Sequence, residues 1–540
     1  MKKIILNILS IGILTGVTAC TSDYVHYNTN PYDATQNEME RDGYSTRSAL
    51  TNLQGWVVPL DVNTNQFTEC LLGGSYGGYL ADSNNGFNGK NFAQLNPEEH
   101  WLQVMFNSVI PKIFENYKRI KGVTKDPVTL SVAQIVKVAS LQRVTDTYGP
   151  MPYSKVGEDA KITAPYDSQK DIYTKMFAEL DESIEQLTNH RTEDFNEQAD
   201  WVFQGKVEKW IKFANSLKLR MAIRISNVEP QLAKQKAEEA VSHSIGVMTS
   251  NADNAFVTCQ NINPFKVVMY DYNEGDSRVS ADLTSYMTGL KDPRCESYFT
   301  KSTFDLPEAN GFVGLRSGIQ IPSGKTIKQY SNMKVQSNSK MLWMNAAEVA
   351  FLKAEGALRG WTMGATAKQL YEDGVKLSFE QHNADGVDAY LADNTSTPAL
   401  YKDPVNPAFS YAGTAPTITV KWDDSAEFEV NLERIITQKW IANFPLGLEA
   451  WAEYRRTGYP LLMPVTKNNS GGVVSSTRGA RRLPYPQRER TDNTENYNSA
   501  VSSLLGGQDN MATDLWWAKK KLNLYVVYLK FFHYHNNKNI

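Results

Sequence analysis

Two loop segments of the chain combine aromatic rings with amide side chains, a combination suited to binding sugars. A sugar presents apolar C–H patches ringed by hydroxyl groups, so it pairs well with a ring face next to hydrogen-bonding groups. The candidate ligand-binding rings are Tyr76, Tyr79, Phe87, Tyr270 and Tyr272. The alternative, also open from the sequence, is that these rings are buried and pin the turns in which they lie.

The first three rings lie in the Gly- and Asn-rich stretch 73–87, and the other two precede Asn273 and Asp276. This composition is typical of an irregular loop that presents side chains to a ligand. Arg278 joins the candidate set because a guanidinium can donate to ligand oxygens. An Arg close to an Asp in a loop more often braces that loop, which is the competing role for Arg278 and for Arg294.

Motifs for catalysis and cofactor binding are missing from the sequence. There is no Gly-x-Ser-x-Gly elbow and no His-Glu-x-x-His pair, and only 7 His occur. Asp423 and Asp424 can be proposed as an acid–base pair for glycoside cleavage, but among 59 acidic residues such neighbours arise by chance. We therefore predict a protein that is not an enzyme and binds neither cofactor nor metal. A surface glycosidase is the alternative from a different class.

Charge and cysteine content bear on which partners, metal sites and disulfides the protein has. The formal net charge is -3 and the 56 basic residues are dispersed, which argues against a nucleic-acid partner. Cys70, Cys259 and Cys295 show no metal-ligand spacing. They are either buried free thiols or include one disulfide, and the spacing does not decide between these.

The N-terminus has the features of an exported lipoprotein. Lys2 and Lys3 precede the apolar run Ile4–Leu14, which is too short to span a bilayer. Val17-Thr-Ala-Cys20 then resembles a bacterial lipobox, in which the Cys is diacylated and becomes the new N-terminus. We predict a signal peptide over residues 1–19, lipidation of Cys20, and a chain anchored to the membrane without spanning it.

The elements that must position the loops are mostly helical, and the stretch Lys209–Ser226 is central among them. Its apolar residues recur at three- and four-residue steps, which predicts a packing helix buried over much of its surface. Lys212, Arg220 and Arg224 share another face of this helix. We expect that face to be solvated, and pairing with acidic neighbours is the alternative.

Similar periodicity predicts further helices that pair into hairpins from about residue 98 onward. They are expected over residues 98–120, 127–148, 169–187, 232–243, 342–359, 365–382, 428–444 and 446–455, with a short one at 44–53. A loop-rich insertion over residues 244–340 interrupts the hairpins, and we expect recognition chemistry there. The predicted fold class is mainly α, with tetratricopeptide-like helix hairpins and a loop-rich ligand-binding region.

Several blocks of the sequence, taken together, resemble the SusD/RagB family of outer-membrane nutrient-binding lipoproteins. Besides the lipobox they include Arg143-Val-Thr-Asp-Thr-Tyr-Gly-Pro-Met-Pro-Tyr-Ser154, Tyr166-Asp-Ser-Gln169, Trp210-Ile-Lys-Phe-Ala-Asn-Ser-Leu-Lys-Leu-Arg-Met-Ala222, Ala347-Glu-Val-Ala-Phe-Leu-Lys-Ala-Glu355 and Arg455-Arg-Thr-Gly-Tyr-Pro460. The blocks span almost all of the chain up to Trp517.

The resemblance implies one SusD-like domain over residues 20–518, no enzymatic activity, and a place on the outer membrane facing the cell exterior. It also implies binding of oligosaccharides or glycans and their delivery to a SusC-like TonB-dependent transporter. Capture of oligopeptides, as on the RagB side of the family, is the alternative within this architecture. The shared blocks identify no binding residues. Residues 519–540 continue past the family's usual end as an atypical C-terminal extension.

Overall fold

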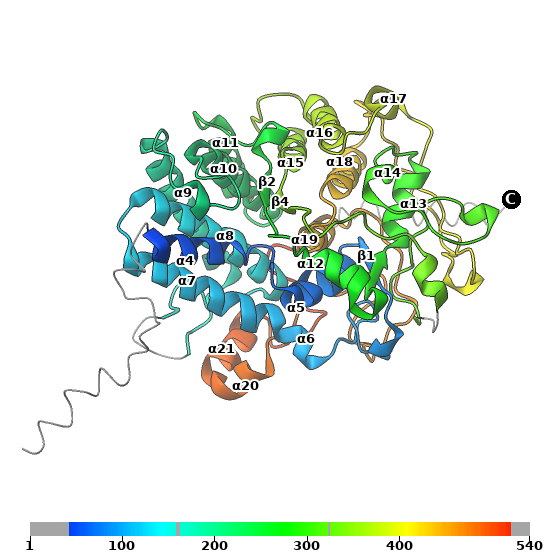
Figure 1. Ribbon diagram of the computed structural model, residues 1–540, viewed down its shortest axis with the longest axis horizontal. Coiled ribbons are helices and arrows are strands. Elements are labelled where there is room, and N and C mark those ends of the chain that lie inside the picture. Colours follow the sequence, from blue (N-terminus) through cyan, green and yellow to red (C-terminus); the bar gives the residue numbers. More distant parts are fainter. Residues whose placement is uncertain (1–42, 158–162, 322–324, 520–540) are drawn as a thin grey trace, which may run out of the picture.

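The computed structural model describes residues 43–157, 163–321 and 325–519, and most of its elements are helices (Figure 1). The predicted signal peptide, Cys20 and nearly all of the predicted C-terminal extension lie outside the described residues. Within the described ranges, no helix is both long and apolar enough to cross a membrane.

The predicted helices are present in the predicted order, and most of them pair as predicted. The helices at 428–444 and 446–455 do not form the expected hairpin, because the first packs on the helix at 346–358 and the second on residues 66–74. The helices are α4 Tyr44–Gln54, α7 Ile110–Val123, α8 Pro127–Tyr148, α9 Gln169–Asn189, α10 Val207–Arg224, α11 Pro230–Ser242, α15 Ala346–Leu358, α16 Ala367–Gln381, α18 Phe428–Ala442 and α19 Gly447–Thr457. α7 packs on α8, α8 on α9, α9 on α10 and α10 on α11, and α15 pairs with α16. The mainly α fold class with stacked hairpins is therefore confirmed.

Local capping explains where several of these helices begin. Asp126 precedes α8 and its carboxylate accepts the backbone N–H of Thr129 at 2.8 Å. Ser168 does the same for α9, accepting from Asp171 at 3.1 Å. Each cap satisfies a backbone donor that has no partner inside the helix.

The N-terminal part contains helical structure that periodicity did not predict. α5 Val62–Asn65 runs into the π-helical segment η2 Gln66–Gly74. Another π-helical segment, η4 Met105–Val109, lies between α6 Glu99–Val104 and α7, within the helix expected over 98–120. A π-turn places side chains at a wider spacing than 3.6 residues, so a search for that period misses η2.

One predicted helix begins later than expected. Residues 342–359 were expected to be helical throughout, but Met341–Met344 form the strand β4, which pairs antiparallel with β2 Ala255–Val257. All four residues of β4 are buried. A short, fully buried apolar run cannot be assigned to helix or strand from its periodicity, because both faces are covered.

The predicted insertion is less irregular than expected. It contains the helices α12 Pro264–Lys266, α13 Ala281–Gly289 and α14 Cys295–Tyr298, and the strand β3 Ser277–Val279. β3 pairs antiparallel with β1 Leu80–Asp82, which lies in the Gly- and Asn-rich stretch. Cys70, Cys259 and Cys295 are free, buried thiols, so neither region is held by a disulfide.

The expectation of a solvated basic face on α10 is wrong, and the alternative of acidic partners is confirmed. Lys212 pairs with Asp253 at 2.9 Å, and Arg220 lies 2.6 Å from Glu348 on α15. Arg224 has no exposed surface. Its guanidinium is bound by three carboxylates from two other helices, those of Asp146 on α8 and of Glu449 and Glu453 on α19.

We predict that Arg224→Met lowers the free energy of unfolding by about 3–5 kcal/mol, because it leaves buried carboxylates without their counter-charge. Lys112→Met is the matched control, since Lys112 and its partner Glu115 are 50% and 65% exposed. We expect that control to change stability by less than about 1 kcal/mol. Urea unfolding followed by circular dichroism measures both. Equal losses for the two variants would contradict the structural role assigned to Arg224.

Candidate ligand-binding site

The two loop segments predicted to bind ligand lie side by side, although almost 200 residues separate them in sequence. The register of β1 and β3 pairs Ala81 with Arg278 and Asp82 with Ser277. The loop that follows β1 and the loop that precedes β3 therefore emerge at the same end of this two-stranded sheet. We call them the paired loops, residues 83–90 and 270–276.

Asp276 holds the paired loops together from a fully buried position. Its carboxylate accepts hydrogen bonds from the side-chain amides of Asn84 at 2.8 Å, Asn273 at 2.9 Å and Gln66 at 2.6 Å. Lys328 adds a cross-link, because its ammonium donates to the backbone carbonyl of Asn273 at 2.9 Å. The loops are irregular in conformation but tied at several points.

Phe87 and Tyr272 are two of the three candidate rings that keep exposed surface on the paired loops. Both are half-buried and pack against the hydrophobic core from outside. Phe87 meets Trp101 edge to face at a centroid distance of 4.9 Å, which helps to fix its ring. Exposed asparagines adjoin both rings in the sequence, Asn88 next to Phe87 and Asn273 next to Tyr272, and partly exposed rings beside amides have the chemistry expected of a sugar-binding surface.

Tyr270 is half-buried and has a partly structural role. Its hydroxyl donates to the backbone carbonyl of Met333 at 2.6 Å, and the Lys266 ammonium lies 4.1 Å from its ring centroid. Burial raises the pKa of the Tyr270 phenol, so the hydroxyl stays protonated and remains a donor. The ring therefore has one face covered by a cation and its polar tip engaged.

Tyr76 and Tyr79 are buried, so their prediction as ligand-binding residues is wrong. Tyr79 has no exposed area, stacks on Trp440 at 5.4 Å and donates its hydroxyl to the Trp440 carbonyl at 2.5 Å. Tyr76 is 8% exposed, and its ring packs against Trp451 at 5.1 Å. The alternative stated from the sequence, rings that pin turns, describes these two positions.

Gly73 and Gly77, beside these rings, allow two backbone segments to pack closely. A Cβ placed on Gly77 would lie 2.5 Å from the carbonyl oxygen of Gly447, at the start of α19. A Cβ on Gly447 would in turn lie 2.2 Å from the backbone of Gly73. Two backbones can approach this closely only where neither residue has a side chain, which explains the glycines at 73, 77 and 447.

Arg278 braces the insertion and is 5% exposed, so it too is corrected as a ligand contact. Its guanidinium donates to the backbone carbonyls of Met269 at 2.9 Å and Glu274 at 3.1 Å. Burial lowers its pKa, and no carboxylate pairs with it among the described residues. Arg294 likewise braces its own loop through Asp292 at 2.6 Å, as expected.

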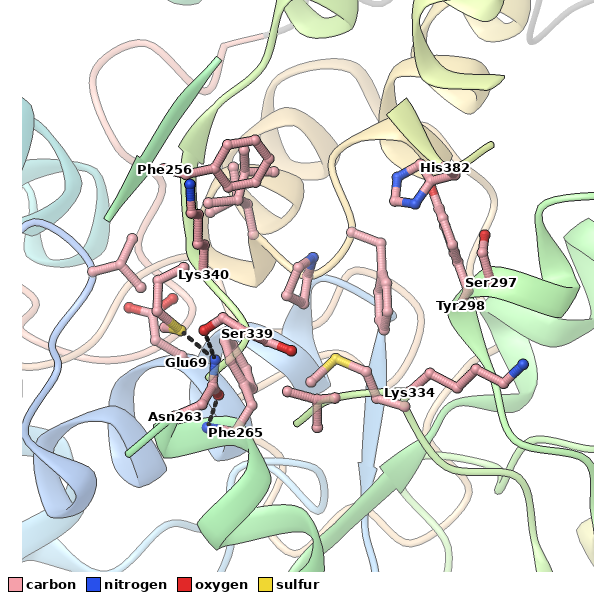
Figure 2. Close-up of a pocket in the computed structure, with 18 of the residues that line it drawn as sticks. Glu69, Phe256, Asn263, Phe265, Ser297, Tyr298, Lys334, Ser339, Lys340 and His382 are labelled. Carbon is pink, nitrogen blue, oxygen red and sulfur yellow. Dashed lines mark hydrogen bonds between the residues drawn. The ribbon is translucent and has the colours of Figure 1, made fainter. Parts of the chain in front are cut away.

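A cavity of about 170 Å³ opens beneath the insertion, next to the segment that Tyr270 supports (Figure 2). Phe265, Tyr298 and Phe444 supply aromatic walls, and Lys334 and Lys340 are exposed residues on its lining. Glu69 also lines the cavity, but both its oxygens accept from Arg143 at 2.7 Å. Its negative charge is therefore already compensated.

His382 stands across this cavity from Phe265 in Figure 2, beside Tyr298. The rings of His382 and Tyr298 meet edge to face, with their centroids 4.5 Å apart. Burial lowers the pKa of His382 to about 4, with the nearby Arg294 acting in the same direction. The imidazole is thus neutral at pH 7 and adds no charge to the cavity.

The sequence reasoning missed most of the residues that form this cavity. Phe265 and Tyr298 lie within the insertion where recognition was expected, but His382 and Phe444 follow the ends of two other helices, α16 and α18. No local pattern connects them, because they meet only in the folded chain. In the described ranges, no cluster of His, Cys, Asp or Glu side chains suits a metal ion.

The adjacent carboxylates considered for glycoside cleavage do not form an acid–base pair. Asp423 accepts the backbone N–H and hydroxyl of Ser425, which together hold its pKa below the usual range. Asp424 accepts the indole N–H of Trp422 at 2.9 Å. A general acid for glycoside cleavage needs a raised pKa, so Asp423 lacks the property that this role requires.

We predict different stability effects at the buried and half-exposed rings. Tyr79→Ala should lower the free energy of unfolding by about 3–5 kcal/mol, since it empties a fully buried aromatic site. Tyr272→Ala should lower the free energy of unfolding by less than about 1 kcal/mol, because the ring is only partly buried. Denaturant titration tests both. A large loss for Tyr272→Ala would mean that its ring is structural and that it does not belong to a binding surface.

Comparison with known proteins gives one consistent result. The model of the SusD-like family, described as Susd and RagB outer membrane lipoprotein, matches residues 26–518. A SusD homologue from Bacteroides uniformis is 51% identical, with a TM-score of 0.85 and coverage of 89% of this chain and 100% of that chain. The comparison with curated proteins finds no match.

Two further solved structures cover 88% of this chain and 99% of their own chains, each with a TM-score of 0.82. One is a SusD homologue from Bacteroides thetaiotaomicron with 42% identity. The other is a chitin-binding SusD homologue from Flavobacterium johnsoniae with 38% identity.

Proposed function

The chain belongs to the SusD-like family of outer-membrane lipoproteins, and we propose that within this family it captures oligosaccharides without cleaving them. The captured glycan then passes to a SusC-like TonB-dependent transporter, over which this protein acts as a lid. The protein is held by a lipid on Cys20 and faces the cell exterior. One domain, residues 20–518, performs this function, and residues 519–540 are an extension to it.

The observation that carries the proposal is the arrangement of the paired loops. They come from distant parts of the chain, are fixed by Asp276, and expose ring surface at Phe87 and Tyr272. A surface held in place before binding loses less conformational entropy when a ligand arrives. Partly exposed rings beside asparagine residues suit a pyranose, which offers apolar C–H patches ringed by hydroxyl groups.

The chitin-binding relative suggests which sugars to test first. At 38% identity over 88% of this chain, it supports oligomers of N-acetylglucosamine as the leading ligand class. Asp276 has a structural role in this proposal, since it is buried and already accepts three amide donors. Such a carboxylate cannot also protonate a leaving group or attack a sugar.

We predict that Phe87→Ala and Tyr272→Ala each weaken binding of chitotetraose by about fivefold or more, which is the effect of removing an anchoring contact worth about 1 kcal/mol. Isothermal titration of the full-length protein in detergent measures the affinity. Tyr44→Ala is the matched control, because that ring is 49% exposed on α4, away from the paired loops.

Xylo- and malto-oligosaccharides and a peptide digest complete the panel for this experiment, and reducing ends are assayed in every mixture. We expect no new reducing ends. Unchanged affinity in both ring variants would place the ligand elsewhere. Binding of peptides but of no sugar would favour the oligopeptide alternative, and turnover above that of a mock preparation would favour a glycosidase.

Anchoring is tested separately, because Cys20 lies outside the described residues. We predict that Cys20→Ala abolishes labelling with a radioactive fatty acid and moves the protein from the detergent phase to the aqueous phase. The physical reason is that two or three acyl chains supply nearly all of the membrane affinity, at about 0.8 kcal/mol per buried methylene. Retention of the variant in the detergent phase would show that another segment holds the protein on the membrane.

A further inference from the structure

A second cavity, of about 250 Å³, lies outside the paired loops and is lined by none of their residues. We call it the tyrosine cavity. It forms where α13 meets the long segment 398–416 and the segment 458–464, close to the end of α19. Its rings are Tyr286, Tyr401, Tyr411 and Tyr454.

Three of these rings are held rigidly by hydrogen bonds from their hydroxyl groups to the backbone. Tyr454 donates to the carbonyl of Thr477 at 2.9 Å, and Tyr401 to that of Gly314 at 2.9 Å. Tyr286 accepts the backbone N–H of Leu461 at 2.9 Å. The walls of the cavity are therefore set before any ligand arrives, which lowers the entropic cost of binding.

Tyr411 and Asp282 provide polar groups of the lining that are available to a ligand. Tyr411 is half-buried, and no described residue hydrogen-bonds its hydroxyl. Asp282 is 5% exposed and accepts the backbone N–H of Met463 at 2.7 Å, while no described side chain donates to it. Burial raises the pKa of Asp282 to about 6.

The charge of the lining decides which class of ligand fits. Among the described residues that line the cavity, none is Lys, Arg or His, and Asp282 carries the one charge, which repels an anionic ligand. A purely apolar ligand would desolvate that carboxylate without giving it a donor. Arg316 already acts on Asp282 electrostatically, which reduces the attraction for a cationic ligand. A neutral ring that carries hydroxyl donors meets all three conditions.

We infer that the tyrosine cavity is a second sugar-binding site, which takes one hydroxylated ring against Tyr411 and Tyr454 with a hydroxyl group donating to Asp282. This inference rests on the proposed function and adds a separate place for a glycan. A volume of about 250 Å³ is many times that needed to hold one water, which leaves room for a sugar ring.

Monosaccharides are the probes that separate this site from the paired loops. N-acetylglucosamine and methyl β-glucoside are titrated into the full-length protein in detergent, and binding is followed by saturation-transfer NMR. The background is the Phe87→Ala, Tyr272→Ala double variant, in which the paired loops have lost their rings. We expect this background to retain weak monosaccharide binding, with a Kd in the millimolar range.

Tyr411→Ala and Asp282→Asn, each added to that background, should weaken the retained binding by about fivefold or more. Tyr411→Phe is the matched control, because it keeps the ring face and removes only the hydroxyl group, so a smaller loss is expected. Thermal melting of each variant confirms that it is folded. Tyr411 is half-buried, so its variants report on binding even if Asp282→Asn destabilises the chain.

The outcomes separate this inference from the proposed function. If the double variant loses chitotetraose binding and the cavity variants leave monosaccharide affinity unchanged, the tyrosine cavity is not a sugar site and the proposed function stands. If the wild-type protein binds no sugar of the panel, both fall. Loss of the retained binding in Tyr411→Ala, with a normal melting temperature, supports the second site.

Discussion

The buried guanidinium of Arg224 is the interaction on which the helical scaffold depends. It lies on the central helix α10 with no exposed surface, and it draws carboxylates from α8 and α19 to one point. Arg456 extends the network, because it binds both Glu453 of its own helix and Glu355 of α15, each at about 2.6 to 2.7 Å. The helices α8, α10, α15 and α19, which are separate in sequence, are thereby fixed relative to one another.

Such a network need not make the fold more stable than an apolar core would. Removing charges from water costs several kcal/mol for each ion, and their mutual attraction offsets this only in good geometry. At Glu453 the geometry is good, since Arg456, Lys439 and Arg224 hold the pKa of this carboxyl well below its usual range in spite of burial. At Asp146 burial outweighs Arg224 and raises the pKa of the carboxyl. A charge network also specifies partners, because any other packing of these helices would leave a buried charge unpaired.

The paired loops are built on this scaffold through aromatic contacts. Trp440 of α18 stacks on Tyr79, and its indole donates to the carbonyl of Gly77 at 2.7 Å. β1 follows directly after Tyr79, so the position of the paired loops is set by a helix more than 350 residues away in sequence. Rigid support beneath an exposed surface is the arrangement expected of a pre-organised site. A second weak site on the same body would raise the avidity for a long glycan with no further contact at the first.

The sequence by itself determined the long helices of this protein, and the tertiary structure decided which side chains reach the surface. Helical periodicity and caps such as Asp126 and Ser168 are local, so these helices followed from the sequence, as did the family. Whether a tyrosine in a Gly-rich stretch points inward depends on what covers it. Tyr79 and Tyr272 are alike in local composition. Trp440 covers the ring of Tyr79, whereas the ring of Tyr272 is only partly buried. The charge on Arg224 was visible in the sequence, but its partners come from residues 146 to 453, and only the folded chain brings them within hydrogen-bonding distance.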